Sequence, residues 1–346
     1  MTGPHDASDQ NHPALTPAQR AGQRLMVGFN GSRFSDTLKH YIENLKVGGL
    51  ILFSQNLESS GQISELCHAA QSFARRCGQP PLFIAIDQEG GVVARLKPPF
   101  TQFDGNPHMR STHDAREFAR ITASELSSIG VNMNMAPVLD VLPPNEPSVM
   151  TSRAFGHDPK WVAQLGTAVI DTMQRRGIMA VAKHFPGIGR TVLDSHEDLP
   201  DSDLSAEALA TVDLVPFQAA VESEVAGIML SHIRYLQIDP QWPASLSATI
   251  AIDLLRQKLG YDGLVLTDDF DMGAIAKHFD IPAIVAQCLA AQVDILLICH
   301  ESSKIEQACR EIVRRCKTSE ELSTGEKNAV ARIMAAKKKY LAAEPG

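Results

Sequence analysis

Eight short apolar runs, rich in β-branched residues, recur along the 346-residue chain and alternate with longer segments. Runs this short that are apolar on both faces are typical of strands in a buried parallel sheet. The predicted strands are Leu25–Phe29, Gly49–Phe53, Leu82–Ile86, Val131–Ala136, Ile178–Ala182, Ala226–Leu230, Gly263–Leu266 and Val293–Ile298.

The segments between the runs have the periodicity of amphipathic helices. In Trp161–Gly177, apolar residues repeat every three or four positions (Val162, Leu165, Val169 and Met173), and Gly177 ends the helix. Comparable segments are 34–45, 63–76, 115–129, 206–223, 250–259, 274–291 and 304–315. Eight strands alternating with eight helices predict a single-domain α/β fold, a (β/α)₈ TIM-type barrel. An open doubly wound sheet is the competing architecture.

Two terminal segments fall outside this alternation. A last helix, about Glu326 to Leu341, is predicted as an extra C-terminal element, with Lys337, Lys338 and Lys339 on a solvated face. Residues 1–17 are polar and contain no charged segment leading into an apolar stretch, so we expect a disordered or surface-draped tail. The barrel domain is then predicted over residues 18–346.

Charge and cysteine content narrow the class of protein. The formal net charge is −8 and no Lys/Arg stripe occurs, which argues against a nucleic-acid-binding surface. No apolar run approaches the roughly 20 residues that span a bilayer. The six cysteines lack C-x-x-C spacing, so reduced, buried thiols are expected. We predict a cytoplasmic protein, a monomer, that binds neither nucleic acid nor membrane.

Polar residues able to do chemistry follow strand after strand. They are Asn30, Asn56, Asp87, Asp140, Lys183–His184, Ser231–His232, Asp268–Asp269 and His300. In a barrel the C-terminal strand ends form the active-site face, so these side chains should converge on one mouth. Helix capping could explain Asn30 or Asp140, but it does not easily explain Lys, His and Asp clusters on several strands.

The segment Thr267-Asp268-Asp269-Phe270-Asp271 directly follows a buried strand. Two acids in that position are costly unless they are paired or used. Asp269 or Asp271 could cap the following helix, which would leave Asp268 free to face the barrel mouth. The pattern alone supports a functional and a capping interpretation equally.

A loop rich in Gly and Pro follows the fifth strand. Lys183–Arg190 contains Pro186, Gly187 and Gly189, and Asp194 and His196 come after it. A carboxylate two residues from an imidazole can fix its tautomer and stabilise its protonated form, so that His196 can donate and later accept a proton. A polar surface loop, or a metal site formed by Asp194, His196 and Asp198, is the alternative. Their spacing matches no zinc pattern, and we expect no metal.

A third segment, Ile86–Arg95, places Asp87 at a strand end, followed by a Gly pair and Arg95. An Asp and an Arg at the mouth suit the gripping of sugar hydroxyls, although each residue alone is more often structural. The Gly pair lacks the dinucleotide-binding spacing, so no organic cofactor is expected.

Together these segments resemble glycoside hydrolase family 3, in particular its single-domain β-N-acetylglucosaminidase branch of peptidoglycan recycling. The family pattern K-H-F-P-G-x-G-x-x-x-x-D-S-H-x-x-L-P is matched from Lys183 to Pro200. The resemblance extends from about Gly22 to Cys299, and this long motif is highly specific. The Thr-Asp-Asp motif is weaker alone but occurs in the expected place and order.

The resemblance implies a role for each candidate residue. Asp268 would be the nucleophile of a retaining enzyme, and His196, oriented by Asp194, its acid/base. The residues that would hold the N-acetylglucosamine ring are Asp87, Arg95, Arg153, Lys183 and His184. The implied substrate is N-acetylglucosaminyl-1,6-anhydro-N-acetylmuramic acid, with or without its peptide, and no metal or cofactor is implied. We further expect the Gly/Pro loop to close over substrate.

Two positions depart from the family pattern. The family usually has His where this chain has Ile188, and commonly Arg where it has Val92. The first lies in the loop expected to be mobile, and the second leaves Arg95 in place. These departures bear on the natural substrate and on its aglycone rather than on the reaction type.

Three other functions fit part of the pattern. A phosphorylase is possible because a neutral His196 would not repel phosphate. A β-glucosidase of the same family would resemble two-domain proteins that draw their acid/base from a further domain. A non-catalytic sugar-binding barrel would have no use for both Asp268 and the Asp194–His196 pair.

Overall fold

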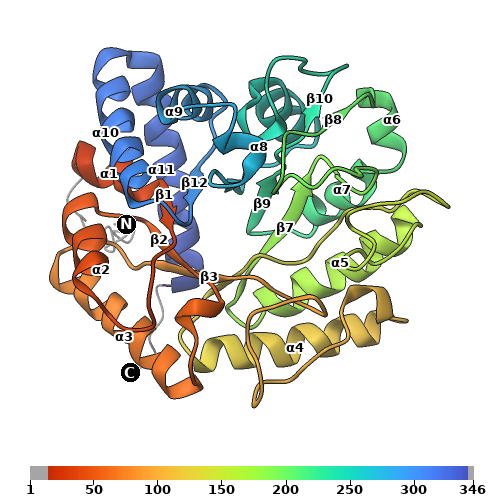
Figure 1. Ribbon diagram of the computed structural model, residues 1–346, viewed down its shortest axis with the longest axis horizontal. Helices are drawn as coiled ribbons and strands as arrows, with labels where there is room; N and C mark the ends of the chain where they lie inside the picture. The colour runs from red at the N-terminus through yellow and green to blue at the C-terminus, as the bar shows by residue number, and fades with distance from the viewer. Residues whose placement is uncertain (1–14, 342–346) are drawn as a thin grey trace, which may run out of the picture.

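A computed structural model describes residues 15–341 (Figure 1). Eight parallel strands close into a barrel in the order β1-β12-β11-β9-β7-β6-β3-β2. They are β1 (Leu25–Val27), β2 (Gly49–Leu52), β3 (Phe83–Ile86), β6 (Met133–Asn134), β7 (Met179–Phe185), β9 (Gly227–Leu230), β11 (Leu264–Asp269) and β12 (Ile295–Ile298). Each strand coincides with one predicted run. The TIM-type barrel is therefore confirmed, and the open sheet is wrong.

Helices surround the barrel in Figure 1. They are α1 (Pro17–Gln23), α2 (Asp36–His40), α3 (Ser60–Arg76), α4 (Thr112–Ser128), α5 (Pro159–Gln174), α6 (Ala206–Thr211), α7 (Leu214–Glu222), α8 (Gly273–Ala276), α9 (Ile281–Ala290), α10 (Ser302–Thr318) and α11 (Glu320–Leu341). π-helical segments span Tyr41–Leu45 and Thr249–Lys258, and short 3₁₀ turns span Ser54–Asn56, Asn106–His108 and Ala244–Leu246. Residues 1–14 of the predicted tail lie outside the described residues, and Thr16 caps α1.

Two predicted helices are each divided in two. The segment 206–223 forms α6 and α7, and 274–291 forms α8 and α9. Proline explains both breaks, because it lacks an N–H and its ring clashes with the carbonyl four residues earlier. Pro216 therefore prevents a continuous helix past Val212, four residues earlier. Pro282 likewise prevents a continuous helix past His278. Pro282 instead lies in the first turn of α9, which Asp280 caps through the Ala283 N–H.

Short strands that the sequence did not reveal extend the loops at the barrel mouth. β4 (Gln88–Gly90) pairs with β5 (Val93–Ala94) in the loop after β3. β8 (Asp201–Ser202) and β10 (Arg234–Tyr235) pair between the loops after β7 and β9. The barrel register also shifts after Ala182 in β7 and after Leu266 in β11. Such irregularities redirect side chains, and here they precede Lys183 and Asp268.

The barrel interior is a packed core that α11 closes at the N-terminal end of the strands. Met, Ile, Leu and Phe side chains fill it, and Ile333, Ala336 and Tyr340 of α11 pack against them. Lys337 is buried there, where its Nζ donates to Gln23 Oε1 at 2.6 Å and to the Gly48 carbonyl at 2.9 Å. Its predicted place on a solvated face is therefore wrong, because the helix turns that face into the barrel.

Three further features complete the fold. In Figure 1, α1 (red) lies beside α10 and α11 (blue), and Arg20 pairs with Glu326 at 2.7 Å. All six cysteines are free. Within residues 15–341, no helix combines the length and apolarity needed to cross a bilayer.

Candidate active site

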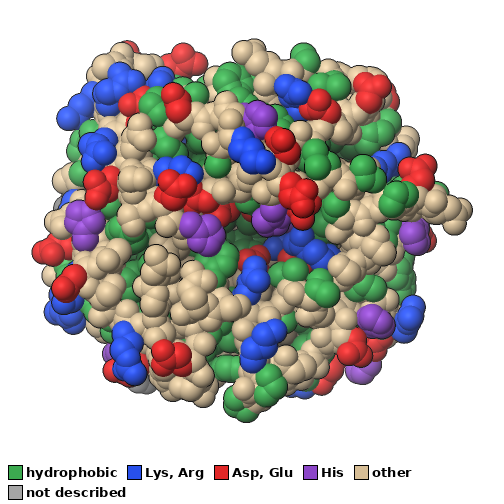
Figure 2. Space-filling model, in the orientation of Figure 1, with side chains coloured by type: hydrophobic (Ala, Val, Ile, Leu, Met, Phe, Trp, Pro, Cys, Tyr) green, Lys and Arg blue, Asp and Glu red, His purple; other side chains and the backbone are tan. Residues whose placement is uncertain are grey.

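The barrel mouth collects charged side chains, as the strand ends predicted. Figure 2 shows this face hollowed near its centre, where acidic and basic side chains gather below a rim that includes histidines. The hollow suits a polar ligand rather than an apolar one. Its residues come from the ends of β3, β7, β9 and β11 and from the loops that follow them.

Asp268 is the second-to-last residue of β11, at this mouth, and is partly buried. Its Oδ1 accepts the Asp269 N–H at 2.8 Å. Burial would raise the pKa of Asp268, but its interactions with the rings of His232 and His184, with the adjacent backbone N–H and with the Lys183 ammonium hold that pKa below its ordinary value. Asp268 is therefore an ionised carboxylate at neutral pH, as a nucleophile or an electrostatic stabiliser must be.

His232 supports this segment from the end of β9. The residue is buried, its Nδ1 lies 2.8 Å from Ser245 Oγ, and its Nε2 lies 3.0 Å from the Asp269 carbonyl. Burial lowers the pKa of His232, so the ring is neutral at pH 7. A neutral ring that donates from Nε2 and accepts at Nδ1 fixes the backbone directly after Asp268.

The predicted capping roles of Asp269 and Asp271 are wrong. Helix α8 has no side-chain cap. Asp269 Oδ1 instead accepts the Cys299 N–H at 3.0 Å, and Asp271 Oδ2 accepts the His300 N–H at 2.7 Å. Both acids thus tie the loop after β11 to the end of β12. Burial raises the pKa of Asp269 to about 6.

Three predicted sugar-binding residues meet in one charged cluster. The Lys183 ammonium is buried and lies 2.7 Å from Asp87 Oδ1 and 2.7 Å from Glu89 Oε1. Arg95 Nη2 lies 3.5 Å from Asp87 Oδ2. Burial would raise the pKa of Asp87, but Lys183 and Arg95 hold it below its usual value. Asp87 therefore stays ionised beside two cations.

Glu89, which sequence reasoning missed, is the buried centre of this cluster. Arg153 binds it in a bidentate way, with Nε at 3.0 Å and Nη2 at 2.7 Å from the two carboxylate oxygens. Burial would raise the pKa of Glu89, but Lys183 and Arg153 lower it. The only sequence signal was an acid between a strand end and a Gly pair. Nothing local indicated that its partners lie 64 and 94 residues away.

His184 and Asp140 form a second buried pair next to the cluster. His184 Nδ1 lies 2.8 Å from Asp140 Oδ2, and its Nε2 lies 3.4 Å from Arg153 Nη2. Asp140 Oδ1 also accepts the Ile188 N–H at 2.8 Å. Asp140 is therefore a positioning residue for His184 and for the base of the following loop, and the helix-capping interpretation of Asp140 is wrong.

The Asp194–His196 pair lies on the loop after β7. Asp194 Oδ1 accepts both the His196 backbone N–H at 2.9 Å and the ring Nδ1 at 2.8 Å. The two side chains are 52% and 68% exposed, so they remain accessible to a ligand. Burial alone would raise the pKa of Asp194. Hydrogen bonds from His196 and the charge of Arg153 instead lower that pKa below its ordinary value.

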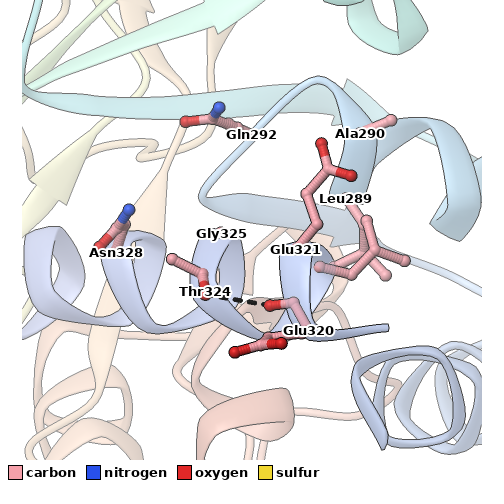
Figure 3. Close-up of a pocket in the computed structure, with 9 residues that line it drawn as sticks. Leu289, Ala290, Gln292, Glu320, Glu321, Thr324, Gly325 and Asn328 are labelled. Atoms are coloured by element: carbon pink, nitrogen blue, oxygen red, sulfur yellow. Dashed lines mark hydrogen bonds between the residues drawn. The ribbon is translucent and has the colours of Figure 1, made fainter. Parts of the chain in front are cut away.

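Within residues 15–341, no group of three His, Cys, Asp or Glu side chains is arranged to hold a metal ion. A cavity of about 490 Å³ lies where α9 ends and α11 begins, at the opposite end of the barrel. Figure 3 shows its lining, including Gln292, Glu320 and Thr324, which contains neither cation nor histidine.

A polar, charged mouth at the C-terminal strand ends is where TIM-type barrel enzymes have their active sites, so the fold and the site define an enzyme of this class. Residues 18–336 match the glycosyl hydrolase family 3 N-terminal domain, and the chain belongs to this family. It is therefore an enzyme, a hydrolase of the β-hexosaminidase type. A beta-hexosaminidase from Nitrosomonas eutropha is 36% identical over 296 residues, which cover 82% of each chain.

Two solved structures are similar over nearly the whole chain. The family 3 beta-N-acetylglucosaminidase from Paenibacillus sp. str. FPU-7 is 36% identical with a TM-score of 0.92, covering 96% of this chain but 64% of that one. The present chain thus spans slightly under two thirds of that protein. The beta-N-acetylhexosaminidase from Beutenbergia cavernae is 28% identical with a TM-score of 0.87, covering 94% of this chain and 99% of the other.

Proposed function

We propose that this enzyme is a retaining β-N-acetylglucosaminidase that removes terminal N-acetylglucosamine from peptidoglycan fragments. The observation that supports it most is the presence at one mouth of an ionised Asp268 and of a histidine whose Nδ1 is held by Asp194, on a loop bonded to the segment that follows Asp268. Because Nδ1 is engaged, His196 exchanges its proton through Nε2. The two groups supply the nucleophile and the acid/base that retention requires.

In the first step, the Asp268 carboxylate attacks the anomeric carbon while His196 donates a proton to the departing glycosidic oxygen. The carbon–oxygen bond to the aglycone breaks, and a glycosyl ester forms on Asp268. In the second step, His196 takes a proton from water, which attacks the same carbon and releases Asp268. The two inversions restore the β configuration.

The charged cluster suits the binding of a sugar ring. Asp87, Arg95, Arg153, Lys183 and His184 are proposed to hold the N-acetylglucosamine hydroxyls at the mouth. Lys183, Arg95 and Arg153 pair with Asp87 and Glu89, so most of the charge in the cluster is compensated and its donors and acceptors are fixed in place. Such preorganised groups bind a neutral sugar with little reorganisation.

Hydrolysis of a chromogenic N-acetylglucosaminide by three variants tests the assignment. Asp268→Ala should abolish turnover, and His196→Ala should reduce kcat by about 10²- to 10⁴-fold, as expected when no general base activates the water of the second step. His40→Ala, which removes a remote surface histidine, is the control and should remain active. A slowly released fluorinated N-acetylglucosaminide should label the peptide that contains Asp268. A label elsewhere would contradict the proposal.

Two comparisons define the reaction further. N-acetylglucosaminyl-1,6-anhydro-N-acetylmuramic acid should be cleaved more efficiently than N,N′-diacetylchitobiose, and the reverse preference would remove the peptidoglycan assignment. Free N-acetylglucosamine should form at the same rate with and without phosphate. Accumulation of the sugar 1-phosphate would show a phosphorylase instead. The monomeric state and the cytoplasmic location stay predictions.

A further inference from the structure

The loop that carries His196 rests directly on the segment that follows Asp268. The Gly273 N–H donates to the His196 carbonyl at 3.2 Å, and the Ala274 N–H donates to the Ser195 carbonyl at 3.0 Å. Gly273 begins α8, five residues after Asp268. Backbone hydrogen bonds of His196 are thus made to the same loop that emerges from the tip of β11.

This contact requires glycine at position 273. A Cβ built there would lie 2.5 Å from the Glu197 carbonyl oxygen and 2.6 Å from that of His196. Both neighbours are backbone atoms of the loop, so a side chain at 273 would push the loop away. The approach of the two segments is therefore as close as two backbones allow.

Side chains from α8 and the turn after it extend the contact. His278 Nε2 lies 2.6 Å from Asp198 Oδ1, and the Lys277 ammonium donates to the Glu197 carbonyl. Asp198 Oδ1 also accepts the Leu199 N–H at 2.8 Å, which orients that carboxylate toward His278. Residues 195–198, on both sides of His196, are consequently held by the segment that follows Asp268.

We propose that Gly273, Asp198 and His278 are positioning residues that hold the acid/base loop in place relative to the nucleophile. The inference rests on the proposed function, because it assumes that His196 donates the proton. The exposed Asp198–His278 pair contributes little to global stability. Its role is instead geometric, since a displacement of about 1 Å in a catalytic group can cost about 100-fold in rate.

The dependence of kcat/KM on the leaving group separates positioning from general damage. This parameter reports steps up to formation of the glycosyl-enzyme, in which only poor leaving groups need a proton. His278→Ala and Asp198→Ala should lower kcat/KM about tenfold for alkyl or sugar aglycones, and less than about twofold for 2,4-dinitrophenyl. The melting temperature should stay within about 1 °C of wild type.

Three further variants complete the test. His278→Gln keeps a donor for Asp198 and should recover most of the lost rate. Gly273→Ala should show the same leaving-group dependence with a larger loss. His40→Ala is the matched control, since its side chain is 42% exposed against 40% for His278 and likewise contacts a carboxylate, Glu306.

The outcomes distinguish the two proposals. His196→Ala should itself show the strongest leaving-group dependence. If His196→Ala does so but His278→Ala and Asp198→Ala do not, the positioning role is wrong and the proposed function stands. Equal losses on all leaving groups, or faster turnover when the contact is broken, also overturn the positioning role. If His196→Ala shows no such dependence, both proposals fall.

Discussion

At the scale of single residues, the main feature of the mouth is a set of ion pairs between carboxylates and cations that are largely buried. Lys183, Arg153 and Glu89 have their charges buried or nearly so, and the two cations keep the Glu89 carboxylate ionised. Removing one partner from such a group is far more damaging than removing a surface pair, because a buried charge is left without compensation.

Glu89→Gln should therefore lower the free energy of unfolding by about 3 kcal/mol, the usual cost of breaking a buried pair. Urea unfolding at pH 7 measures it. Glu117→Gln, which removes an exposed partner of Arg120, should leave the free energy of unfolding almost unchanged. Because the folded-state pKa of Glu89 is lowered, its contribution is present above its unfolded pKa of about 4.3 and is lost as pH falls further.

Sequence reasoning located the residues that directly follow strands but not those that organise them. Asp87, Lys183, His184 and Asp268 follow strong apolar runs, so their convergence could be predicted. Glu89 and Asp140 could not be assigned, because their roles arise from side-chain contacts that cross 44 to 94 residues of sequence. Local patterns contain no information about such partners.

At the scale of elements, the loop after β7 is firmly anchored where it begins. The Tyr235 hydroxyl donates to the Gly187 carbonyl at 2.8 Å, and a Cβ at Gly189 would lie 2.0 Å from the Val141 carbonyl. Arg190 Nη2 lies 3.3 Å from Asp213 Oδ2. Any movement of the loop is therefore confined to the residues between Arg190 and Ser195, where Val192 is 68% exposed.

Asp213 lies fully buried beneath this anchor, and burial raises its pKa to about 6. The folded chain thus binds a proton more tightly than the unfolded chain, whose pKa is about 3.9, so wild-type stability falls as pH rises from about 4 to 6. Asp213→Asn removes this dependence. Relative to wild type, the variant should gain about 2–3 kcal/mol between pH 4 and pH 7.5 in urea unfolding. Asp262→Asn, an exposed control, should show no gain.

The predicted elements agree with the structure where one hydrophobic pattern extends over the whole element. All eight strands were predicted because each is an apolar run between polar turns. The predicted helices 206–223 and 274–291 failed at Pro216 and Pro282, whose effect on the preceding turn outweighs the apolar repeat. The two-residue strands β5, β8 and β10 are too short for any repeat to be detected.

At the scale of the whole molecule, α11 completes the barrel by covering its base, and Lys337 is the polar residue in that contact. Burial lowers the pKa of Lys337 to about 7. Between pH 7 and the unfolded pKa of about 10.4, the unfolded chain keeps a proton that the folded chain has lost. Wild-type stability should therefore rise with pH across this window.

Lys337→Met should abolish that rise, which urea unfolding at pH 7 and pH 9.5 would detect. Lys338→Met, one position along on the exposed face, should keep the wild-type dependence. A rise that persisted in Lys337→Met would show that another group causes it.

The closed base of the barrel also determines where substrate enters and where products leave. Because side chains fill the barrel axis and α11 covers its far end, the mouth is both entrance and exit. In the proposed two-step mechanism, the aglycone lies outermost and must diffuse away before water can reach the anomeric carbon, so the freed monosaccharide leaves last. Under that proposal, free N-acetylglucosamine rather than the departing aglycone is the product expected to compete with incoming substrate.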